Sequence, residues 1–358
     1  MNASSWFTAI LRAGPRVGLA TLAAALLVSP SASGTPMPPE APLSRFEFLA
    51  PRMGTMFRIV LFAASADTAQ AAATAAFARV AALNACMSDY DPTSELRQLE
   101  VSPPGTAVPV SADLFAVLQH GQVLASQSAG AFDVTLGPLV SLWRDSRRTQ
   151  RLPSAAALAV ARAASGSARL RLDSDRRTVT LLAPGMRLDL GGIAKGYAAD
   201  AALAVLAQHG LPHAMVAAGG DLALGRPPPG EPGWKVALAP FGSAAGAPVS
   251  VVASEVGIST SGDAEQFVEI DGTRYSHILD PATGLGLTSA AAVTVIARTA
   301  TFSDGLATAG GVLAARDPVR VAACAGTGTL VLVLRRDAQG RLLREQHGTP
   351  PPGLLPFL

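Results

Sequence analysis

The sequence predicts an α+β fold in which mostly antiparallel or mixed sheets are flanked by helices. Apolar segments of strand length are separated by short turn sequences more often than by helices, and this pattern favours β-hairpins. Ala-rich stretches of helical length lie between these groups of strands. Of the 358 residues, 49% are hydrophobic and 15% are charged, which excludes a disordered chain.

Helices are predicted where Ala-rich stretches follow capping residues. Ser111 is a candidate N-cap, and Asp91-Pro92 resembles a helix start, with an acid at the cap and proline in the first helical position. The predicted helices cover residues 66–87, 111–128, 138–143 and beyond, 154–164, 195–209 and 300–315, with one more starting at 91.

Strands are predicted from short apolar segments and from period-two alternation, as in Leu170, Leu172, Val179 and Leu181. Asp271-Gly272 is a strong two-residue hairpin turn. The predicted strands and hairpins cover residues 56–63, 169–182, 214–218, 234–238, 249–253, 267–275, 292–297 and 329–334, the last of which is expected to close the sheet.

The N-terminus has the pattern of an export signal. Arg12 and Arg16 precede an apolar run that is shorter than the roughly 20 residues of a membrane span, and small residues follow it. We expect a signal peptide over residues 1–33 that is cleaved, and an exported, periplasmic protein; an uncleaved N-terminal anchor is the alternative. A Pro-rich linker over 34–50, a main domain over 51–340 and a loose tail over 341–358 are expected to follow.

The charges are balanced. The chain has 28 basic and 26 acidic residues, and Arg12 and Arg16 are the only charges in the leader, so the rest is formally neutral. A general nucleic-acid binder typically has a basic patch, so this class is disfavoured. Cys86 and Cys324 can form one disulfide or none, and neither has metal-ligand spacing to another Cys or His.

The segment from Asp189 to Tyr197 (DLGGIAKGY) carries the sharpest chemical signal. An apolar stretch ends in an acid, a glycine pair follows, and a helix begins near Lys195. Glycines let a ligand approach the backbone, and free N–H groups at a helix start bind phosphate. A purely structural strand-to-helix turn is the alternative.

Four further segments are candidates for chemistry. The loop from Ala218 to Asp221 is either a site of backbone approach or a simple turn, and the segment from Ser259 to Asp263 adds hydroxyls and an acid. His277 is the histidine with the most polar neighbourhood. Asp304 and Thr308 share a helical face, where they can bind a hard cation such as Mg2+, or form a solvated face or an internal hydrogen bond.

The order of these segments resembles the FAD:protein FMN transferase family, called ApbE and formerly labelled thiamine-biosynthesis lipoproteins. The resemblance covers about residues 50 to 335, so that 51–340 is expected to be the catalytic domain, with the active site between two lobes if it has two. It is carried by MGT (53–55), MSDYDPTSEL (87–96), GAFDVTLGPL (130–139), the 189–200 block, 218–221, the 259–263 loop, 275–284 and 301–309.

The resemblance implies Mg2+-dependent transfer of FMN from the substrate FAD to a Ser or Thr hydroxyl of a partner protein, with release of AMP. The family's acceptors are membrane electron-transfer subunits. The FAD-contact positions matched are Met53, Tyr90, Ala131, Phe132, Asp133, Asp189, Lys195 and His277. The metal ligands matched are Asp304, Thr308 and the backbone oxygen of Gly192. Either His277 or Asp304 is expected to assist removal of the hydroxyl proton.

Two departures from the family pattern are visible. Ala282 stands where relatives often have Arg, and the lipid-attachment Cys of many members is missing, which favours a soluble periplasmic enzyme. The alternatives are an FAD pyrophosphatase that yields FMN and AMP, a non-catalytic periplasmic flavin-binding protein and a redox flavoprotein. The shared face of Asp304 and Thr308 favours the transferase or the pyrophosphatase, because a carrier or a redox protein needs no cation at the pyrophosphate.

Overall fold

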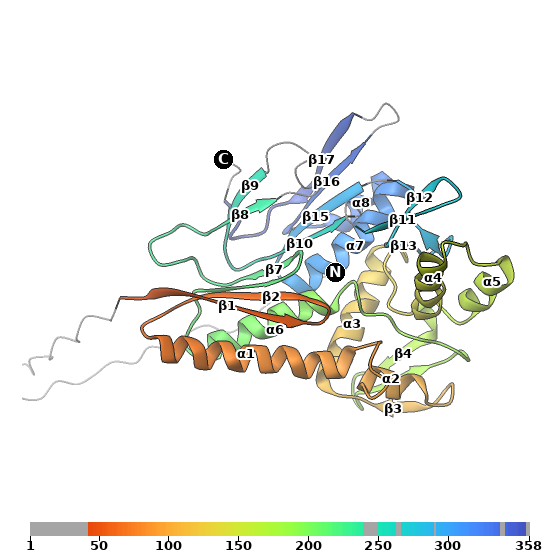
Figure 1. The fold of residues 1–358 in the computed structure, drawn as a ribbon, viewed down its shortest axis with the longest axis horizontal. Helices are drawn as coiled ribbons and strands as arrows, with labels where there is room; N and C mark the ends of the chain where they lie inside the picture. The colour runs from red at the N-terminus through yellow and green to blue at the C-terminus, as the bar shows by residue number, and fades with distance from the viewer. Residues whose placement is uncertain (1–41, 239–248, 263–265, 290, 337–340, 356–358) are drawn as a thin grey trace, which may run out of the picture. The chain divides into compact units, whose positions relative to one another are not determined.

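An eight-stranded sheet is the largest element of the fold (Figure 1). The computed structural model describes residues 42–238, 249–262, 266–289, 291–336 and 341–355. Every strand pairing in this sheet is antiparallel, which confirms the predicted α+β class. In spatial order the strands are β1 (Ser44–Arg52), β2 (Thr55–Ala63), β6 (Ala214–Ala218), β7 (Asp221–Leu224), β10 (Gly257–Gly262), β15 (Ala291–Ala297), β16 (Thr329–Arg336) and β17 (Leu342–Thr349).

Four smaller antiparallel sheets accompany it. The β11–β12 turn is formed by Asp271 and Gly272, both at positive φ, as expected for this dipeptide in a two-residue hairpin. The strands are β3 (Ala107–Pro109), β5 (Thr178–Leu181) and β4 (Leu170–Asp173); β8 (Trp234–Leu238) and β9 (Val249–Ala253); β11 (Phe267–Ile270) and β12 (Thr273–Ser276); β13 (Leu279–Asp280) and β14 (Leu285–Gly286).

Most helices in the described ranges begin at a side chain that caps the first turn. Ser65, Ser111 and Ser154 each accept a backbone N–H of the following helix. The helices are α1 (Ala66–Met87), α2 (Glu95–Glu100), α3 (Ala112–Gln127), α4 (Gly137–Thr149), α5 (Ala155–Ala163), the 3-10 turn η1 (Ser167–Arg169), α6 (Ala194–Gln208), α7 (Ala300–Arg316) and α8 (Pro318–Ala325).

The two faces of the large sheet are buried differently. In β2, Ile59 and Leu61 contact the main core, to which α1, α6 and α7 contribute, whereas Val60 and Phe62 face Trp234 and the β8–β9 hairpin. Because successive side chains of a strand point to opposite faces of the sheet, the single apolar segment of β2 packs against both layers. The main core therefore fixes α6 and α7 on the same side of the sheet.

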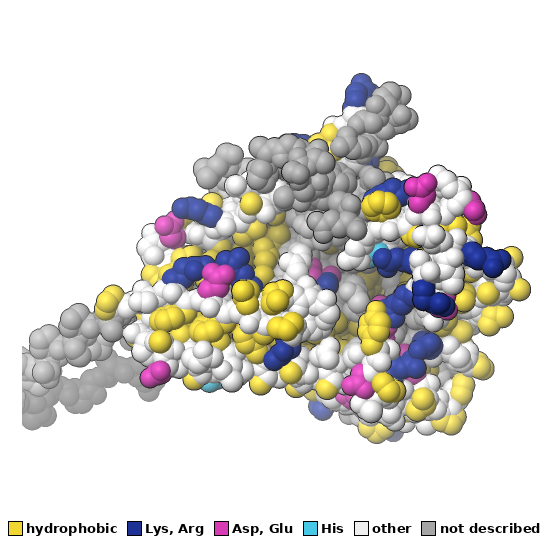
Figure 2. Space-filling model, in the orientation of Figure 1, with side chains coloured by type: hydrophobic (Ala, Val, Ile, Leu, Met, Phe, Trp, Pro, Cys, Tyr) yellow, Lys and Arg dark blue, Asp and Glu magenta, His cyan; other side chains and the backbone are white. Residues whose placement is uncertain are grey.

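A third cluster joins α4 and α5 to the β11–β12 hairpin. Trp143 is 2% exposed and packs against Leu139 and Ile270, and its indole N–H donates to the backbone oxygen of Ser276 at 3.1 Å. Figure 2 shows basic side chains on the side that carries α4, whereas hydrophobic side chains follow α1 and the β1–β2 hairpin.

Two segments expected to be irregular are strands. Residues 44–50, assigned to the linker, belong to β1, because Phe46 and Phe48 pack against the main core. Residues 342–349, assigned to the loose tail, form β17, so β16 does not close the sheet. The tail continues against β9, where the N–H of Leu355 donates to the oxygen of Val252 at 2.9 Å. The predicted leader, residues 1–33, lies outside the described residues.

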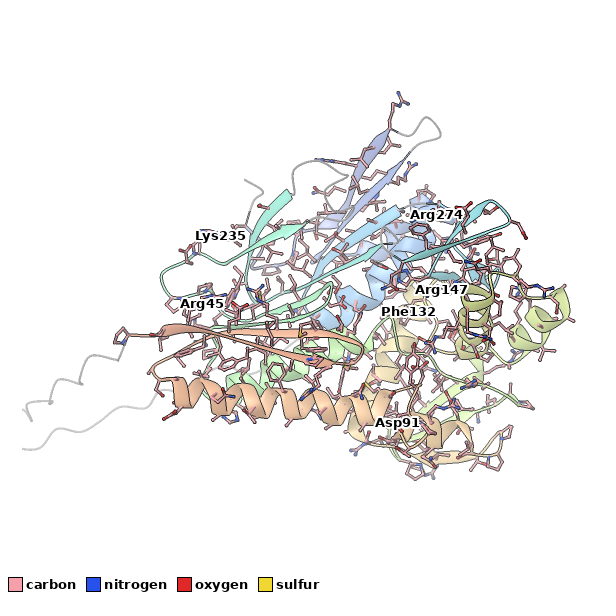
Figure 3. The ribbon with its side chains drawn as sticks, viewed as in Figure 1. Arg45, Asp91, Phe132, Arg147, Lys235 and Arg274 are labelled. Carbon is pink, nitrogen blue, oxygen red and sulfur yellow. The ribbon has the colours of Figure 1, made fainter. Side chains whose placement is uncertain are left out.

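Two local predictions are also corrected. Asp91 (Figure 3) does not cap a helix; it accepts the N–H and the hydroxyl of Thr93 in a turn, and Ser94 caps α2 instead. The segment from 259 was expected to be a loop, but up to Gly262 it is the central strand β10. The hydroxyls of Ser259 and Ser303 lie 2.8 Å apart and are buried between β10 and α7. Asp263 is outside the described residues.

Both cysteines are free thiols. Burial raises the pKa of Cys86 to about 12, beside Ser111 and Glu95, so this thiol is unreactive at neutral pH. Within the ranges that the structure describes, no helix is long and apolar enough to cross a membrane.

Candidate active site

The loop between Asp189 and α6 lies against α7. A Cβ atom on Gly192 would lie 3.1 Å from the Thr308 hydroxyl oxygen and 3.1 Å from the Phe132 ring, so only glycine fits without a shift. The backbone of Gly192 therefore lies beside Thr308, and no described residue forms a hydrogen bond with that hydroxyl. These are two of the three metal-ligand positions predicted from the sequence.

The third position, Asp304, lies one helical turn before Thr308. Its Oδ2 atom accepts the backbone N–H of Gly196 at 3.0 Å, near the start of α6. A carboxylate at a helix start is stabilised by the free N–H groups and the helix dipole. The Oδ1 atom has no hydrogen-bond partner among the described residues, so one carboxylate oxygen remains for a ligand.

Lys195 lies between two buried carboxylates. Its ammonium nitrogen is 2.6 Å from Oδ2 of Asp221 and 3.5 Å from Oδ2 of Asp304. Asp221 is 3% exposed and Asp304 is 4% exposed. The three side chains come from β7, α6 and α7, so only the packing of the core brings them together.

The charges of this cluster are coupled. Burial, together with the charge of Asp221, raises the pKa of Asp304 to about 7, despite the opposing charge of Lys195. Burial lowers the pKa of Lys195, but Asp304 and Asp221 outweigh it and raise this pKa above its ordinary value. Two buried acids thus share one ammonium group, an arrangement that favours binding of a further cation.

The donor set fits a hard cation. Asp304, Thr308 and the Gly192 carbonyl supply only oxygen, which Mg2+ prefers, and few protein ligands leave room for substrate oxygens and water. In the described ranges no three His, Cys, Asp or Glu residues form a metal cluster. Among the three proposed ligand positions, Asp304 is the only carboxylate.

A second group of charges surrounds Asp189. Arg144, on α4, forms ion pairs with Asp189 at 2.9 Å and with Asp89. Its guanidinium also lies 4.7 Å from the ring centre of Tyr90, a side chain of which 78% is exposed. Burial raises the pKa of Asp189, and Arg144 partly opposes this. The exposed ring of Tyr90 and the guanidinium form a surface on which a flat ring can stack.

The segment from Ala131 to Asp133 is largely internal. Ala131 and Phe132 are buried, and the Phe132 ring (Figure 3) reaches Gly192. Asp133 uses both carboxylate oxygens inside the protein: it accepts the N–H and hydroxyl of Thr135, and the N–H of Ser167 at 2.9 Å. Asp133 thus stabilises this loop, and its contact with FAD stays a prediction.

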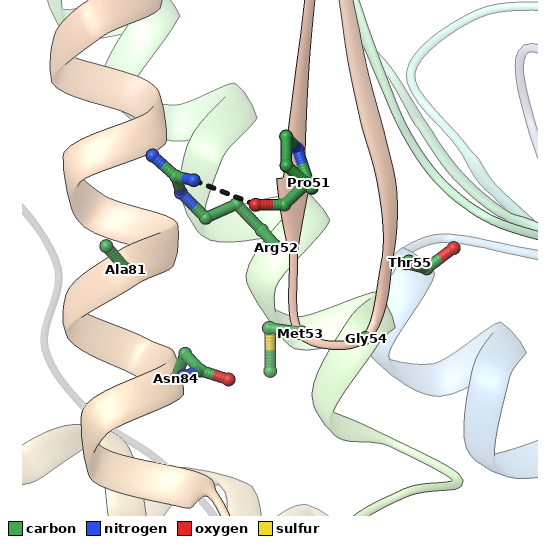
Figure 4. A pocket seen from close by; sticks show the side chains of 7 residues that line it. All are labelled: Pro51, Arg52, Met53, Gly54, Thr55, Ala81 and Asn84. Atoms are coloured by element: carbon green, nitrogen blue, oxygen red, sulfur yellow. Dashed lines mark hydrogen bonds between the residues drawn. The ribbon is translucent and has the colours of Figure 1, made fainter.

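Met53 lies at the tip of the β1–β2 hairpin. It has φ 48° and Gly54 has φ 71°, the signature of a type I′ turn, which a methionine adopts only with strain. Figure 4 shows the Met53 side chain directed towards Asn84 of α1, in a pocket of about 540 Å³. Thr55 points the other way, and a Cβ on Gly219 would lie 3.0 Å from its hydroxyl. The hairpin tip therefore adjoins the turn before Asp221.

His277 lies in the connection after β12. Its backbone N–H donates to the oxygen of Gln266 at 3.0 Å, and its ring Nδ1 is 3.2 Å from the same oxygen. The neighbouring Ile278 lies 3.6 Å from a Cβ built on Gly311, which is on the Asp304–Thr308 face of α7. The structure thus brings the His277 segment to this face, but the ring is not hydrogen-bonded to Asp304 or Thr308.

Sequence reasoning missed three side chains that organise the site. Arg144 was one of 26 arginines, and nothing in its local sequence marked it. The segment from Ala218 to Asp221 was interpreted as a site of backbone approach or a simple turn, and no role was given to the Asp221 side chain; an acid directly after two glycines is the local signal that could have marked it. Asp200 accepts the N–H groups of Ala300 and Thr301 at 2.9 and 2.8 Å and so anchors the start of α7.

Comparisons with known proteins agree on one family. A family model described as the ApbE family matches residues 53–331. An FAD:protein FMN transferase from Klebsiella pneumoniae is 32% identical over 294 residues, which cover 80% of this chain and 83% of that protein.

Solved structures give the same result. The flavin transferase ApbE from Vibrio cholerae is 29% identical, with a TM-score of 0.75, and the match covers 86% of this chain and 98% of that one. The apo flavinyl transferase ApbE from Pseudomonas stutzeri is 31% identical, with a TM-score of 0.74 and coverage of 86% and 95%.

Proposed function

Because this chain belongs to the ApbE family, we propose that it takes FAD and transfers the FMN half to a hydroxyl of an acceptor protein. The acceptor residue is Ser or Thr, the new bond is a phosphoester, and AMP is released. The observation that carries this proposal is the meeting of the Gly192 backbone with Thr308 and Asp304 on one face of α7.

The proposed cofactor is Mg2+, held by Asp304, Thr308 and the carbonyl oxygen of Gly192. Three features support it: the Oδ1 of Asp304 and the hydroxyl of Thr308 have no hydrogen-bond partner among the described residues, and two buried acids share the single Lys195 ammonium. When bound, Mg2+ supplies positive charge that neutralises the pyrophosphate oxygens of FAD.

Phosphoryl transfer depends mainly on positioning and charge, and the chain's own residues supply both. Lys195, about a third exposed, is held by Asp221 at the start of α6, from where its positive charge would stabilise the anionic substrate. The acceptor oxygen attacks the phosphorus on the riboflavin side, the bond between the two phosphate groups breaks, and the electron pair leaves with AMP. The hydroxyl proton passes to a base, for which His277 and Asp304 are the two candidates.

The rest of FAD extends from this centre along the loop to Asp189. Tyr90 and Arg144 offer a stacking surface at one end, and Met53 offers an apolar contact, while the buried Phe132 ring packs behind Gly192. The loop from Asp189 to Gly192 links the two charge clusters in the chain, so a long dinucleotide can contact both.

We also propose that the protein acts on the exported side of the membrane. The supporting observation is the leader pattern of residues 1–33, two arginines followed by an apolar run and small residues. Membrane electron-transfer subunits that carry Ser or Thr on that side are the proposed acceptors. Pulse-labelling the full chain in cells, followed by N-terminal sequencing of the mature form, tests cleavage after the leader.

The central test is incubation of the protein with FAD and Mg2+, with and without a candidate acceptor domain. We expect the acceptor to gain the mass of FMN, with one AMP released for each flavin attached, and slow hydrolysis without acceptor. Asp304→Ala is expected to abolish transfer while FAD binding partly persists. His277→Ala is expected to slow transfer more than it weakens FAD binding.

The alternatives give different products. Free FMN and AMP without a modified acceptor would establish the pyrophosphatase activity instead, and FAD recovered intact would establish a flavin carrier. Near-normal transfer by Asp304→Ala at saturating Mg2+ would contradict the metal ligand.

A further inference from the structure

Asp221 contributes no ligand to the proposed chemistry, yet it is among the most buried charges of the site. It is 3% exposed and its Oδ2 accepts the Lys195 ammonium at 2.6 Å. At that distance the bond is a charge-assisted hydrogen bond, stronger than a neutral one. Asp304 is 3.5 Å from the same nitrogen, so Lys195 is held chiefly by Asp221.

The position of Asp221 is fixed by its backbone. It pairs with Ala218 across the Gly219-Gly220 turn and with Ser259 of β10. A Cβ on Gly220 would lie 3.2 Å from the oxygen of Thr260, so the turn is packed closely against β10. The position of the Asp221 carboxylate is therefore fixed. The Lys195 side chain is long and flexible, so its ammonium group can move to the carboxylate that binds it more strongly.

We propose that Asp221 is a positioning residue that draws Lys195 away from Asp304. Without this anchor, Asp304 would be the remaining buried carboxylate beside the Lys195 ammonium, and their ion pair, now 3.5 Å long, would shorten. The closer ammonium would neutralise the carboxylate whose Oδ1 atom is proposed to hold the cation, and would repel that cation. The inference rests on the proposed function, since it concerns access to the proposed cation site.

The test uses the full chain, saturating FAD and Mn2+ as the probe, with bound Mn2+ measured by electron paramagnetic resonance. Asp221→Asn keeps the shape of the side chain and removes its charge. We expect its Mn2+ affinity to fall by about tenfold or more, because one charge is lost and Lys195 moves onto Asp304. A crystal structure of Asp221→Asn is expected to show the ammonium clearly closer to Asp304 than the 3.5 Å of the wild type.

The second variant separates positioning from a structural role or direct ligation. In Asp221→Asn/Lys195→Met the competing ammonium is gone, so Mn2+ affinity is expected to return towards that of the wild type. If Asp221 only supported the fold or bound the cation itself, the double variant would remain weak. Asp317, the C-cap of α7, lies about 20 Å from Asp304 by helix rise, so Asp317→Asn makes the same change of side chain away from the site and is expected to bind Mn2+ normally.

Three results would overturn the inference: wild-type Mn2+ affinity in Asp221→Asn, no recovery in the double variant, or an unmoved Lys195 in the crystal. Each would leave the proposed transferase intact. Absence of Mn2+ binding by the wild-type chain, tested beside Asp304→Ala, would overturn the cation site and this inference together.

Discussion

The backbone N–H of Gly196 donates a 3.0 Å hydrogen bond to Oδ2 of Asp304, and so ties the first turn of α6 to α7. The two helices approach so closely that a Cβ on Gly196 would lie 2.2 Å from the oxygen of Ala300. The position of α7, and with it the face that carries the proposed metal ligands, therefore depends on a glycine at position 196 of α6.

Gly196→Ala is expected to destabilise the protein, because the backbone of α7 cannot yield to the added methyl group. Overpacking of this kind costs about 1–3 kcal/mol, and we expect the upper end or more. Urea unfolding followed by circular dichroism measures it. Gly311→Ala is the control: its new Cβ would meet Ile278 at 3.6 Å, an ordinary contact, and Ala favours the helix by up to about 1 kcal/mol. Equal stability of Gly196→Ala and the wild type would contradict the close approach.

Lys195→Met is expected to destabilise the fold as well as weaken FAD binding, because it leaves Asp221 and Asp304 buried together without a cation. Removing one partner of a buried ion pair costs about 3–5 kcal/mol, and we expect the low end because the Lys195 side chain is 31% exposed. Lys195→Arg is expected to restore part of both losses.

The only other lysine provides the control for this variant. Lys235 is 71% exposed and pairs with Glu231 on the surface, so Lys235→Met is expected to change stability by less than about 0.5 kcal/mol. If the two Met variants unfold at the same urea concentration, Lys195 is not part of a buried charge cluster.

The stability of the cation-free protein is expected to depend on pH through Asp304. Its pKa is raised from 3.8 to about 7 in the folded state, so its contribution is fully present below pH 3.8 and is lost as pH rises towards 7. The loss is at most about 4 kcal/mol at 1.4 kcal/mol for each pKa unit. Unfolding in chelator between pH 4 and pH 7 measures it, with Asp304→Asn expected to show a shallower decline. Parallel curves for the two proteins would refute the prediction.

Met53→Gly is expected to separate stability from ligand binding. Glycine adopts φ 48° without strain, so about 1 kcal/mol of backbone strain is relieved, while the proposed apolar contact with FAD is lost. Thermal unfolding should therefore be unchanged or improved and FAD affinity, from fluorescence quenching, should fall. Gln150→Gly relieves similar strain at φ 54° at the end of α4 and is expected to leave FAD affinity unchanged. Equal FAD affinity in the two Gly variants would remove Met53 from the site.

The elements predicted well are those whose signals are local. The helix at 66–87 and the helix capped by Ser111 have the predicted bounds to within a residue, because caps and helical hydrogen bonds join near neighbours. The 271–272 turn is likewise set by the conformational freedom of its own two residues. By contrast β1, β7, β10 and β17 were missed or assigned to loops. The short central strands β7 and β10 pair with each other although they lie far apart in the chain. The edge strands β1 and β17 pair with the adjacent β2 and β16, but most of their residues are exposed or only partly buried, so their hydrophobic signal is weak.

The sequence by itself determined that Asp304 and Thr308 share one helical face, because that spacing is a property of the helix, and the order of the motifs identified the family. Only the tertiary structure decided which charges meet there. Lys195 meets Asp221 at 2.6 Å, and Arg144 meets Asp189 at 2.9 Å, because strands and helices distant in sequence pack into one core. The partner of a buried charge is the group that tertiary packing places beside it, and the residues next to that charge in the sequence do not specify this partner.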